Sequence, residues 1–300
     1  MKDWKGYLFV AVAATLWGAS ATMVKHLFNT HYDPLIIVQT RVSIAFIILV
    51  LFFLITNPRT LTFKMRDIPL FFFVGVCGIA GSNYFYYYAI KESNVATAIV
   101  VQYSAPIMVA IYAIAAQHEK MTKYKLIALV SSTTGIFFAV GGLNGLLVAN
   151  RLGVIFALVA AVSYAIFNIA GKSLTRRYSV WSSLVFTLGA ATLFWLVIQP
   201  PQVILRNGYS LADWGVFALV STTSILVPYS FYFFGLHHLT PTRAIITSTL
   251  EPVVAIVTAF VFLGGTLGFL QIIGTVLVIG SIVLLESTSG QREEKAGETP

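Results

Sequence analysis

The sequence predicts an all-α integral membrane protein with ten transmembrane helices, arranged as two inverted five-helix repeats. Of its 300 residues, 58% are hydrophobic and only 10% are charged, whereas soluble domains carry about 25% charged residues. Apolar stretches of roughly 20 residues recur, each long enough to cross ~30 Å of hydrocarbon as a helix. The ten expected spans are 6–28, 34–56, 68–90, 94–116, 123–141, 152–173, 180–198, 212–236, 240–263 and 267–286.

The first half of the chain is repeated in the second half. Gly6–Lys25 reads GYLFVAVAATLWGASATMVK and Gly153–Lys172 reads GVIFALVAAVSYAIFNIAGK, with Gly, Phe, Val, Ala-Ala and Lys at matching places. A second match pairs Pro106 with Pro252, since an Ala-Ile pair stands at the same distance before each proline. Two halves built from one membrane unit are typical of transporters.

The repeat divides the chain into two domains and a tail. Residues 1–145 hold the first five spans, 146–286 hold the second five, and 287–300 form a polar C-terminal tail. Because five is odd, the second copy enters the membrane from the opposite side, which makes the repeat inverted. Gly and Asn residues within 142–151 mark a polar turn between the halves. The tail lacks apolar periodicity, and we expect it to be frayed.

The net charge of +8 reflects membrane topology, and we expect no nucleic-acid partner. If the N-terminus is cytoplasmic, the inside connections hold fourteen basic residues: Lys2, Lys5, Arg59, Lys64, Arg66, Lys120, Lys123, Lys125, Lys172, Arg176, Arg177, Arg243, Arg292 and Lys295. The outside connections hold four: Lys25, Lys91, Arg151 and Arg206. The positive-inside rule then predicts a multi-pass protein of the cytoplasmic (inner) membrane with both termini in the cytoplasm.

Glu251 is the strongest candidate for a functional residue. It lies near the middle of the span 240–263, directly before Pro252, where the first half has Ala105. A charge at a helix centre costs about 2.5–3.5 kcal/mol on insertion scales, so it needs a reason. A cavity carboxylate would bind a cationic group or exchange a proton, since removal from water favours the neutral acid. The alternative is a structural Glu that accepts hydrogen bonds near the proline kink.

Arg41 is a second charge within a span. It lies in the outer third of the second span, where the second half has Thr187 or Leu188. A functional Arg41 would clamp a substrate carboxylate with two hydrogen bonds. The simpler interpretation, which we favour from the sequence, is an ion pair with Asp33 or Glu251, or extension toward the outer headgroups.

Aromatic side chains form a third group. Trp17 in the first span is matched by Tyr164 in the sixth. Both lie in mid-span, where headgroup anchoring is not needed, and both suit the wall of a pocket that stacks on a ring or surrounds an ammonium. Packing between helices is the alternative.

Polar residues beside the matched prolines complete the expected site. Gln102 and Tyr103 precede Pro106 as Ser248 precedes Pro252, and a proline frees a backbone carbonyl near the membrane midplane. We expect substrate-binding roles for Trp17, Asn83, Tyr87, Gln102, Tyr103, Tyr164, Asn168, Tyr232, Ser248 and Glu251. Glu251 and Arg41 are the candidates for charge recognition or coupling.

Several of these stretches resemble the EamA-type families of the drug/metabolite transporter superfamily. The resemblance rests on AAxxWG at 13–18, on Tyr-Tyr-Ala-Ile at 87–90 leading into 95–98, and on Leu-Glu-Pro at 250–252, and it covers residues 4–286. It implies a ten-span secondary transporter. Such proteins export amino acids, toxic metabolites or drugs, while relatives take up amines or move nucleotide sugars. The family often has Gly-Glu after the fourth and ninth spans, where this chain has His118-Glu119 and Gly264-Gly265.

We therefore expect a secondary-active transporter that works by alternating access and exports amino acids or related small metabolites. An uptake carrier for amines such as choline is the alternative within this class, and a membrane-embedded enzyme or channel is the alternative outside it. The sequence has no Walker loop, paired acids, Cys/His cluster or nucleophile–base set, so we expect no enzyme activity, cofactor or metal. The expected partners are a small-molecule substrate, the lipid bilayer and coupled protons, with the protein a monomer or homodimer.

Overall fold

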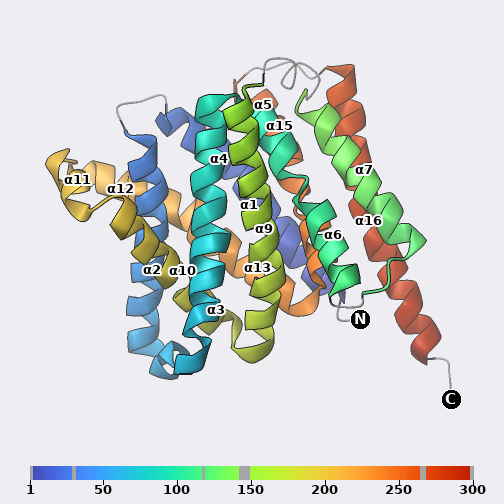
Figure 1. Cartoon of the computed structure of the whole chain (residues 1–300), viewed down its shortest axis with the longest axis horizontal. Helices are drawn as coiled ribbons and strands as arrows, with labels where there is room; N and C mark the ends of the chain where they lie inside the picture. Colours follow the sequence, from blue (N-terminus) through green and yellow to red (C-terminus); the bar gives the residue numbers. More distant parts are fainter. Residues whose placement is uncertain (1–2, 29–31, 117–118, 142–148, 264–267, 298–300) are drawn as a thin grey trace.

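A computed structural model describes residues 3–28, 32–116, 119–141, 149–263 and 268–297 (Figure 1). Every regular element in these ranges is a helix. In chain order they are α1 (Asp3–Phe28), α2 (Pro34–Thr56), η1 (Pro58–Leu61), η2 (Met65–Asp67), α3 (Ile68–Phe72), η3 (Phe73–Ala80), α4 (Gly81–Glu92), α5 (Val95–Gln102), α6 (Ala105–Ala115), α7 (Lys123–Ala139), α9 (Arg151–Arg177), α10 (Val180–Ile198), α11 (Pro201–Arg206), α12 (Leu211–Ser221), η4 (Thr222–Leu226), α13 (Val227–His238), α14 (Pro241–Thr247), α15 (Leu250–Leu263) and α16 (Phe269–Gly297).

Seven helical stretches of the described chain are long and apolar enough to cross a membrane. They are Leu35–Thr56, Met65–Glu92, Val95–Ala115, Arg151–Arg177, Val180–Ile198, Leu211–His238 and Phe269–Thr288. The predicted all-helical membrane fold is therefore confirmed. Helices α1, α7 and the pair α14–α15 occupy the three remaining expected spans, and the total of ten membrane crossings stays a prediction.

The two halves share matched interruptions of their helices. The fourth expected span breaks between α5 and α6 at Tyr103-Ser104, and the ninth breaks between α14 and α15 at Ser248-Thr249. A proline stands in the first turn after each break, where its missing N–H leaves no helical hydrogen bond unmade. The third and eighth expected spans contain the π-helical segments η3 and η4. Segments of this kind are frequently found at functional sites.

Helix α1 joins the halves, because it packs against α13 and α15 of the second half. The approach to α15 is closest at Gly18. A Cβ atom added there would lie 2.8 Å from Val254 Cβ and 2.9 Å from the backbone nitrogen of Ala255. Only a residue without a side chain allows this contact. The AAxxWG stretch therefore brings Trp17 next to the helix that carries Glu251.

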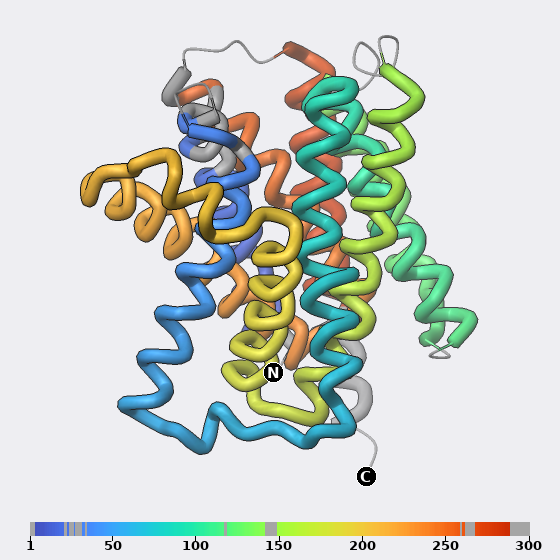
Figure 2. Tube along the Cα trace, turned by 60° about the vertical axis from the view of Figure 1, so that its left-hand side comes forward, coloured from blue at the N-terminus to red at the C-terminus, as the bar shows by residue number. Residues whose placement is uncertain are grey.

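Other helices pair side by side around this centre. Figures 1 and 2 show α4 beside α9, and α7 pairs with α16 at one edge of the bundle (Figure 1). A Cβ at Gly135 of α7 would meet the Gly274 carbonyl of α16 at 2.8 Å, so small residues again allow close packing. The short helices α11 and α12 lie at the opposite edge.

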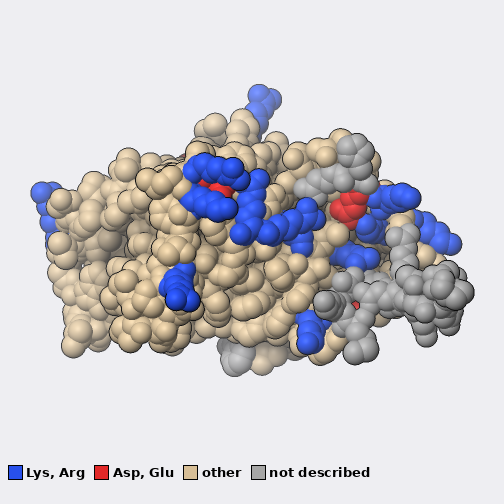
Figure 3. Space-filling model, turned by 90° about the horizontal axis from the view of Figure 1, so that it is seen from below, with Lys and Arg blue, Asp and Glu red and all other residues tan. Residues whose placement is uncertain are grey.

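Basic side chains gather on the lower face of the molecule. Helix α1 begins and α16 ends toward this end, and η1 and η2 lie there (Figure 1). Lys and Arg are spread over the same face, and acidic residues are few (Figure 3). This agrees with the distribution on which the topology prediction rests, while the orientation in a membrane stays a prediction. Of the counted residues, Lys2 and the side chains of Lys25, Arg292 and Lys295 lie outside the described residues.

The C-terminal tail differs from the expectation. Helix α16 does not end at 286 but continues to Gly297, so residues 287–297 are helical where fraying was expected. Gln, Arg, Glu, Lys and Ala in this segment all favour helix. Adding residues to an existing helix also avoids the cost of nucleation. The turn proposed to separate the two halves falls largely within 142–148, outside the described residues.

Candidate substrate site

Arg41 of α2 points into the bundle and bonds to a neutral side chain. Its Nη2 donates to Asn83 Oδ1 of α4 at 2.5 Å, and its Nε is buried without a hydrogen-bond partner among the described residues. The Ser221 hydroxyl donates to the Arg41 carbonyl at 2.6 Å and ties α2 to α12. The expected ion pair with Asp33 does not form, because Asp33 instead caps α2 by accepting from the Leu35 N–H at 2.7 Å.

Glu251 lies in the first turn of α15, directly after the break between α14 and α15. Its Oε2 accepts a hydrogen bond of 2.7 Å from the hydroxyl of Tyr103, which lies at the matching break in the first half. The two broken helices therefore meet at this carboxylate. No salt bridge of Glu251 occurs within the described part of the chain. Arg41 lies within electrostatic reach of it without an ion pair, so that expected pair is absent too.

Arg41 and Glu251 lie within electrostatic reach of each other inside the bundle. Trp17, Arg41, Asn83, Gln102 and Glu251 are only partly buried, although all belong to central positions of their spans. The Gln102 side chain has no hydrogen bond to any described residue. A cation and an anion thus lie at the centre of the fold without forming an ion pair with each other. Sites of this kind mark substrate and ion pathways.

Asn83, the hydrogen-bond partner of Arg41, is itself held by two neighbours. Its Nδ2 donates to the Ile79 carbonyl at 2.8 Å, and the Tyr229 hydroxyl lies 3.4 Å from the same nitrogen. The Ile79 bond lies within one helical turn and fixes the amide so that its oxygen faces Arg41. A sequence argument could select Asn83 but not this partner.

The Trp17 side chain is held in place by one hydrogen bond and two ring contacts. Its Nε1 donates to the Ser224 carbonyl in the π-helical segment η4 at 3.1 Å. Its ring meets Tyr229 edge-on, with centroids 5.0 Å apart, and lies 5.2 Å from the ring of Tyr232. The indole is therefore held in place against η4 and α13. Rigid aromatic groups of this kind suit ligand contact.

Four other expected site residues are buried and form hydrogen bonds with one another. The Tyr164 hydroxyl donates to Ser248 Oγ at 2.8 Å, the Tyr232 hydroxyl donates to Asn168 Oδ1 at 2.5 Å, and Asn168 Nδ2 donates to the Tyr164 carbonyl at 2.8 Å. Asn168, Tyr232 and Ser248 are fully buried and Tyr164 nearly so. Because these groups satisfy one another, they form a scaffold that supports the site and do not offer free donors to it.

The tyrosines of α4 divide between two places. Tyr87, an expected site residue, lies within reach of Asp33 near the start of α2. Its neighbour Tyr86 lies within reach of Glu251 and is partly accessible. Tyr86 is therefore the candidate that the sequence reasoning missed. Its spacing of three residues from Asn83 was the available signal, since such residues share a helix face.

Glu119 has a different environment from these groups. Its carboxylate accepts hydrogen bonds from Thr240 and Thr242, both at 3.1 Å, and forms an ion pair with Lys125. It therefore fastens the connection before α7 to the start of α14. His118 and the Gly264-Gly265 pair lie outside the described residues. Among the described residues, no group of three His, Cys, Asp or Glu side chains could hold a metal ion.

Comparison with known proteins agrees with this geometry. The model of the EamA-like transporter family matches residues 4–141 and 151–287. The chain belongs to the EamA-like transporter family. The predicted resemblance is thereby confirmed, and the two matched segments correspond to the two halves of the fold. As a member of this family, the chain is a multi-pass membrane transporter of a small-molecule substrate and not an enzyme.

Relatives within the EamA-like family extend over nearly the whole chain. The threonine/homoserine exporter RhtA of Escherichia coli (strain K12) is 28% identical over 281 residues, covering 92% of this chain and 87% of the exporter. The protein of the same name from Salmonella typhimurium (strain LT2) is 26% identical, covering 93% and 90%. An uncharacterized transporter of Archaeoglobus fulgidus is 24% identical, covering 93% and 95%.

A solved crystal structure has the same fold as this EamA-like chain. It aligns with a TM-score of 0.77 over 96% of this chain and 98% of that chain. The two sequences are 16% identical, so the likeness concerns the fold alone.

Proposed function

We propose that this protein exports small amino acids of the threonine and homoserine kind, and that it binds them as zwitterions between Arg41 and Glu251. One observation carries the proposal. Arg41 and Glu251 lie within electrostatic reach of each other inside the bundle without forming an ion pair, and each has unused hydrogen-bonding capacity.

The electrostatics of the site favour a zwitterion. Charges in an interior are costly unless they are paired and hydrogen-bonded. Arg41 has one hydrogen bond to Asn83 and an unpartnered Nε, and Glu251 has one hydrogen bond from Tyr103. An α-amino acid would place its carboxylate on the guanidinium and its ammonium on Glu251. The ligand would thus give each of the two charged side chains a partner of opposite charge while adding no net charge to the site.

Neighbouring groups suit the remainder of such a ligand. The free amide of Gln102 is available to hydrogen-bond a side-chain hydroxyl, and the ring of Trp17 provides an apolar wall. The two enterobacterial relatives are exporters of threonine and homoserine, which both carry a hydroxyl. Likeness to these relatives supports both the substrate class and the outward direction of transport.

Arg41 argues against amines such as choline. An amine without a carboxylate would bring a positive charge into the same space as the guanidinium, and like charges repel strongly where water is scarce. The rings of Trp17, Tyr86 and Tyr103 would contact the α-ammonium of an amino acid as readily as a quaternary amine. The uptake alternative thus leaves Arg41 without a role.

Other features support the transport mechanism. The matched helix breaks and π-helical segments of the two halves suit alternating access. A carboxylate that binds the substrate ammonium can bind a proton in its absence, so Glu251 also suits proton coupling. The basic lower face favours both termini in the cytoplasm and a place in the inner membrane. Since the site lies within one chain, a monomer or a homodimer would be functional.

Counterflow in proteoliposomes tests this proposal. Proteoliposomes that contain the purified protein and are loaded with unlabelled L-threonine should accumulate labelled L-threonine and L-homoserine from the outside. Arg41→Gln and Glu251→Gln should each abolish accumulation, whereas Arg206→Gln on α11 should leave it unchanged. Full accumulation by both site variants would refute the assigned roles, and failure of the unaltered protein to exchange either amino acid would refute the substrate class.

A further inference from the structure

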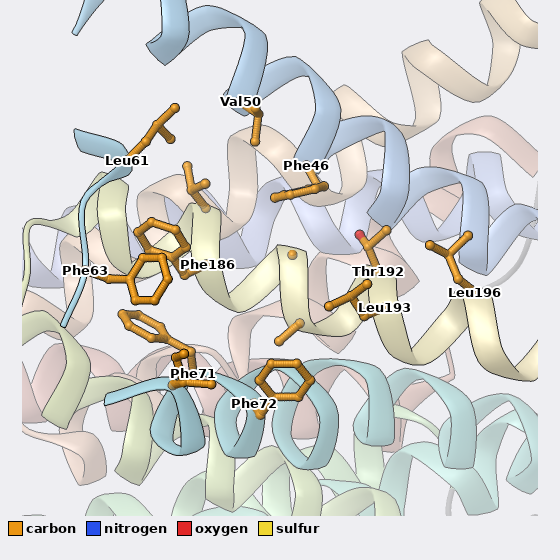
Figure 4. A pocket seen from close by; sticks show the side chains of 14 residues that line it. Phe46, Val50, Leu61, Phe63, Phe71, Phe72, Phe186, Thr192, Leu193 and Leu196 are labelled. Atoms are coloured by element: carbon orange, nitrogen blue, oxygen red, sulfur yellow. The ribbon is translucent and has the colours of Figure 1, made fainter. Parts of the chain in front are cut away.

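An apolar groove on the outside of the bundle lies apart from the substrate site. It has a volume of about 430 Å³, within the ~300–1,000 Å³ typical of ligand pockets. Its walls come from α2 and α3 and its floor from α10 (Figure 4). Thr192 is the one lining residue with a polar side chain, and Phe72, Leu193 and Leu196 at its edge are each more than a third exposed. The groove therefore opens where the spans face lipid.

The length of the groove matches one leaflet of a bilayer. The lining residues of α10 run from Val185 to Leu196, which corresponds to roughly 16 Å along a helix. Half of the ~30 Å hydrocarbon core is about the same length. Figure 4 shows the groove extended from the Leu61 and Phe63 end to the Leu196 end. An extended acyl chain of one leaflet fits these dimensions.

The connection 57–67 closes the lower end of the groove and carries the charges there. Leu61 and Phe63 line the cavity, while Arg59, Lys64 and Arg66 are exposed. These three basic side chains have no ion pair among the described residues.

The one acidic residue of this connection does not offset them. Asp67 is already occupied, since it accepts from Arg177 at 2.9 Å and from the Tyr178 hydroxyl at 2.6 Å. Asp67 also lies within electrostatic reach of Arg66, but one carboxylate leaves an excess of positive charge at this end of the groove.

We propose that this groove binds an anionic phospholipid, with one acyl chain between α2, α3 and α10 and its phosphate on Arg59, Lys64 and Arg66. Basic residues next to a span attract acidic lipids of the adjoining leaflet. Because α2 and α3 belong to the first half and α10 to the second, the bound acyl chain contacts both halves of the protein. Occupancy therefore stabilises the arrangement of the two halves seen here.

Photocrosslinking tests the site on the full-length protein in vesicles. The probes are phosphatidylglycerol and phosphatidylcholine that carry the same diazirine in one acyl chain, each at trace level in unlabelled phosphatidylcholine. Phosphatidylglycerol should label peptides containing 46–50 and 185–196 roughly tenfold more than phosphatidylcholine, as expected when several basic residues each contribute. Equal labelling by the two lipids would reduce the groove to ordinary lipid contact and overturn the proposal, as would labelling that avoids these peptides.

Matched variants separate the chain contact from the headgroup contact. Leu193→Trp fills the groove and should remove the labelling, whereas Leu158→Trp on the exposed face of α9 should not. The double change Arg59→Gln with Lys64→Gln should abolish the preference for phosphatidylglycerol, and Lys120→Gln with Lys123→Gln should retain it. If all four proteins label like the unaltered protein, the proposed contacts are wrong. The comparison of lipids on the unaltered protein decides the matter even if a variant fails to fold.

Discussion

Replacing Glu251 by Gln should weaken substrate binding without unfolding the protein. Gln keeps an oxygen that can accept the 2.7 Å hydrogen bond from Tyr103, so the contact between the two broken helices is retained. The charge that would hold the substrate ammonium is lost. Removing one partner of a buried, hydrogen-bonded charge pair typically costs about 2–5 kcal/mol. At the lower limit this corresponds to a loss of roughly 30-fold in affinity.

Ligand-induced thermal stabilisation measures this loss. L-threonine at about 100 times its dissociation constant should stabilise the unaltered protein by ~2.7 kcal/mol. A 30-fold weaker site should gain only about 0.9 kcal/mol at the same concentration. At roughly 2 °C per kcal/mol for a chain of this size, the shift in Tm falls from about 5 °C to below 2 °C.

Tyr103→Phe is the control variant for Glu251→Gln, because it separates loss of the hydrogen bond from loss of the charge. Tyr103→Phe removes the hydrogen bond but keeps the charge, so it should lower the Tm of the free protein more than Glu251→Gln does and affect the ligand-induced shift less. An equal ligand-induced shift in Glu251→Gln and the unaltered protein would refute the role of the carboxylate in binding. Collapse of the free protein in Glu251→Gln alone would instead make the residue structural.

Three further predictions concern the fold. Gly18→Ala should lower the stability of the fold by about 1–3 kcal/mol, because the added methyl group pushes α1 away from α15. Gly215→Ala on α12 is the control: the added methyl group meets no atom within 4 Å, and the change should raise the stability by roughly 0.5–1 kcal/mol. The hydrogen bond from Tyr32 to Asp213 raises the pKa of Tyr32 to about 12, so the stabilisation lost in Tyr32→Phe should be constant below pH 10 and vanish between pH 10 and 12. Glu119→Gln should lower stability by about 1–3 kcal/mol, because it leaves a buried lysine without its counter-charge.

Thermal unfolding in detergent checks all three. Glu286→Gln is the control for Glu119, since Glu286 is exposed on α16. Equal effects of the two glycine substitutions would contradict the close contact of α1 with α15. A stability difference between Tyr32→Phe and the unaltered protein that persists above pH 12 would contradict the proton linkage. Equal effects of the two glutamate substitutions would contradict the tie between α7 and α14.

The sequence predicted the helical fold and its repeat because both depend on long-range composition and on matching residues. It also singled out Glu251 and Arg41 as candidates, since both charges stand out against apolar surroundings, and their roles stay predictions. These features follow from which residues are present and need no knowledge of side-chain direction. The close approach of α1 to α15 at Gly18 was not predicted, because AAxxWG indicates a family resemblance and does not name the helix that packs against it.

The composition of the site depends on side-chain direction, which the sequence does not give. Tyr86 and Tyr87 are adjacent in sequence but point about 100° apart on a helix, and only the structure shows which one lies near Glu251. Asn168 and Tyr232 looked like lining residues, yet they bond to each other across two helices. The partner of Arg41 is an amide 42 residues away rather than an acid, which no local pattern could indicate.

The measurement that tests the central claim most directly is a double-mutant cycle between substrate groups and site residues. Binding of L-threonine, its methyl ester and its analogue without the amine should be compared in the unaltered protein, Arg41→Gln and Glu251→Gln. We predict that removal of the carboxylate charge weakens binding to the unaltered protein but not to Arg41→Gln, and that removal of the amine does so except in Glu251→Gln. Losses that simply add, with the same cost in all three proteins, would contradict zwitterion recognition by this pair.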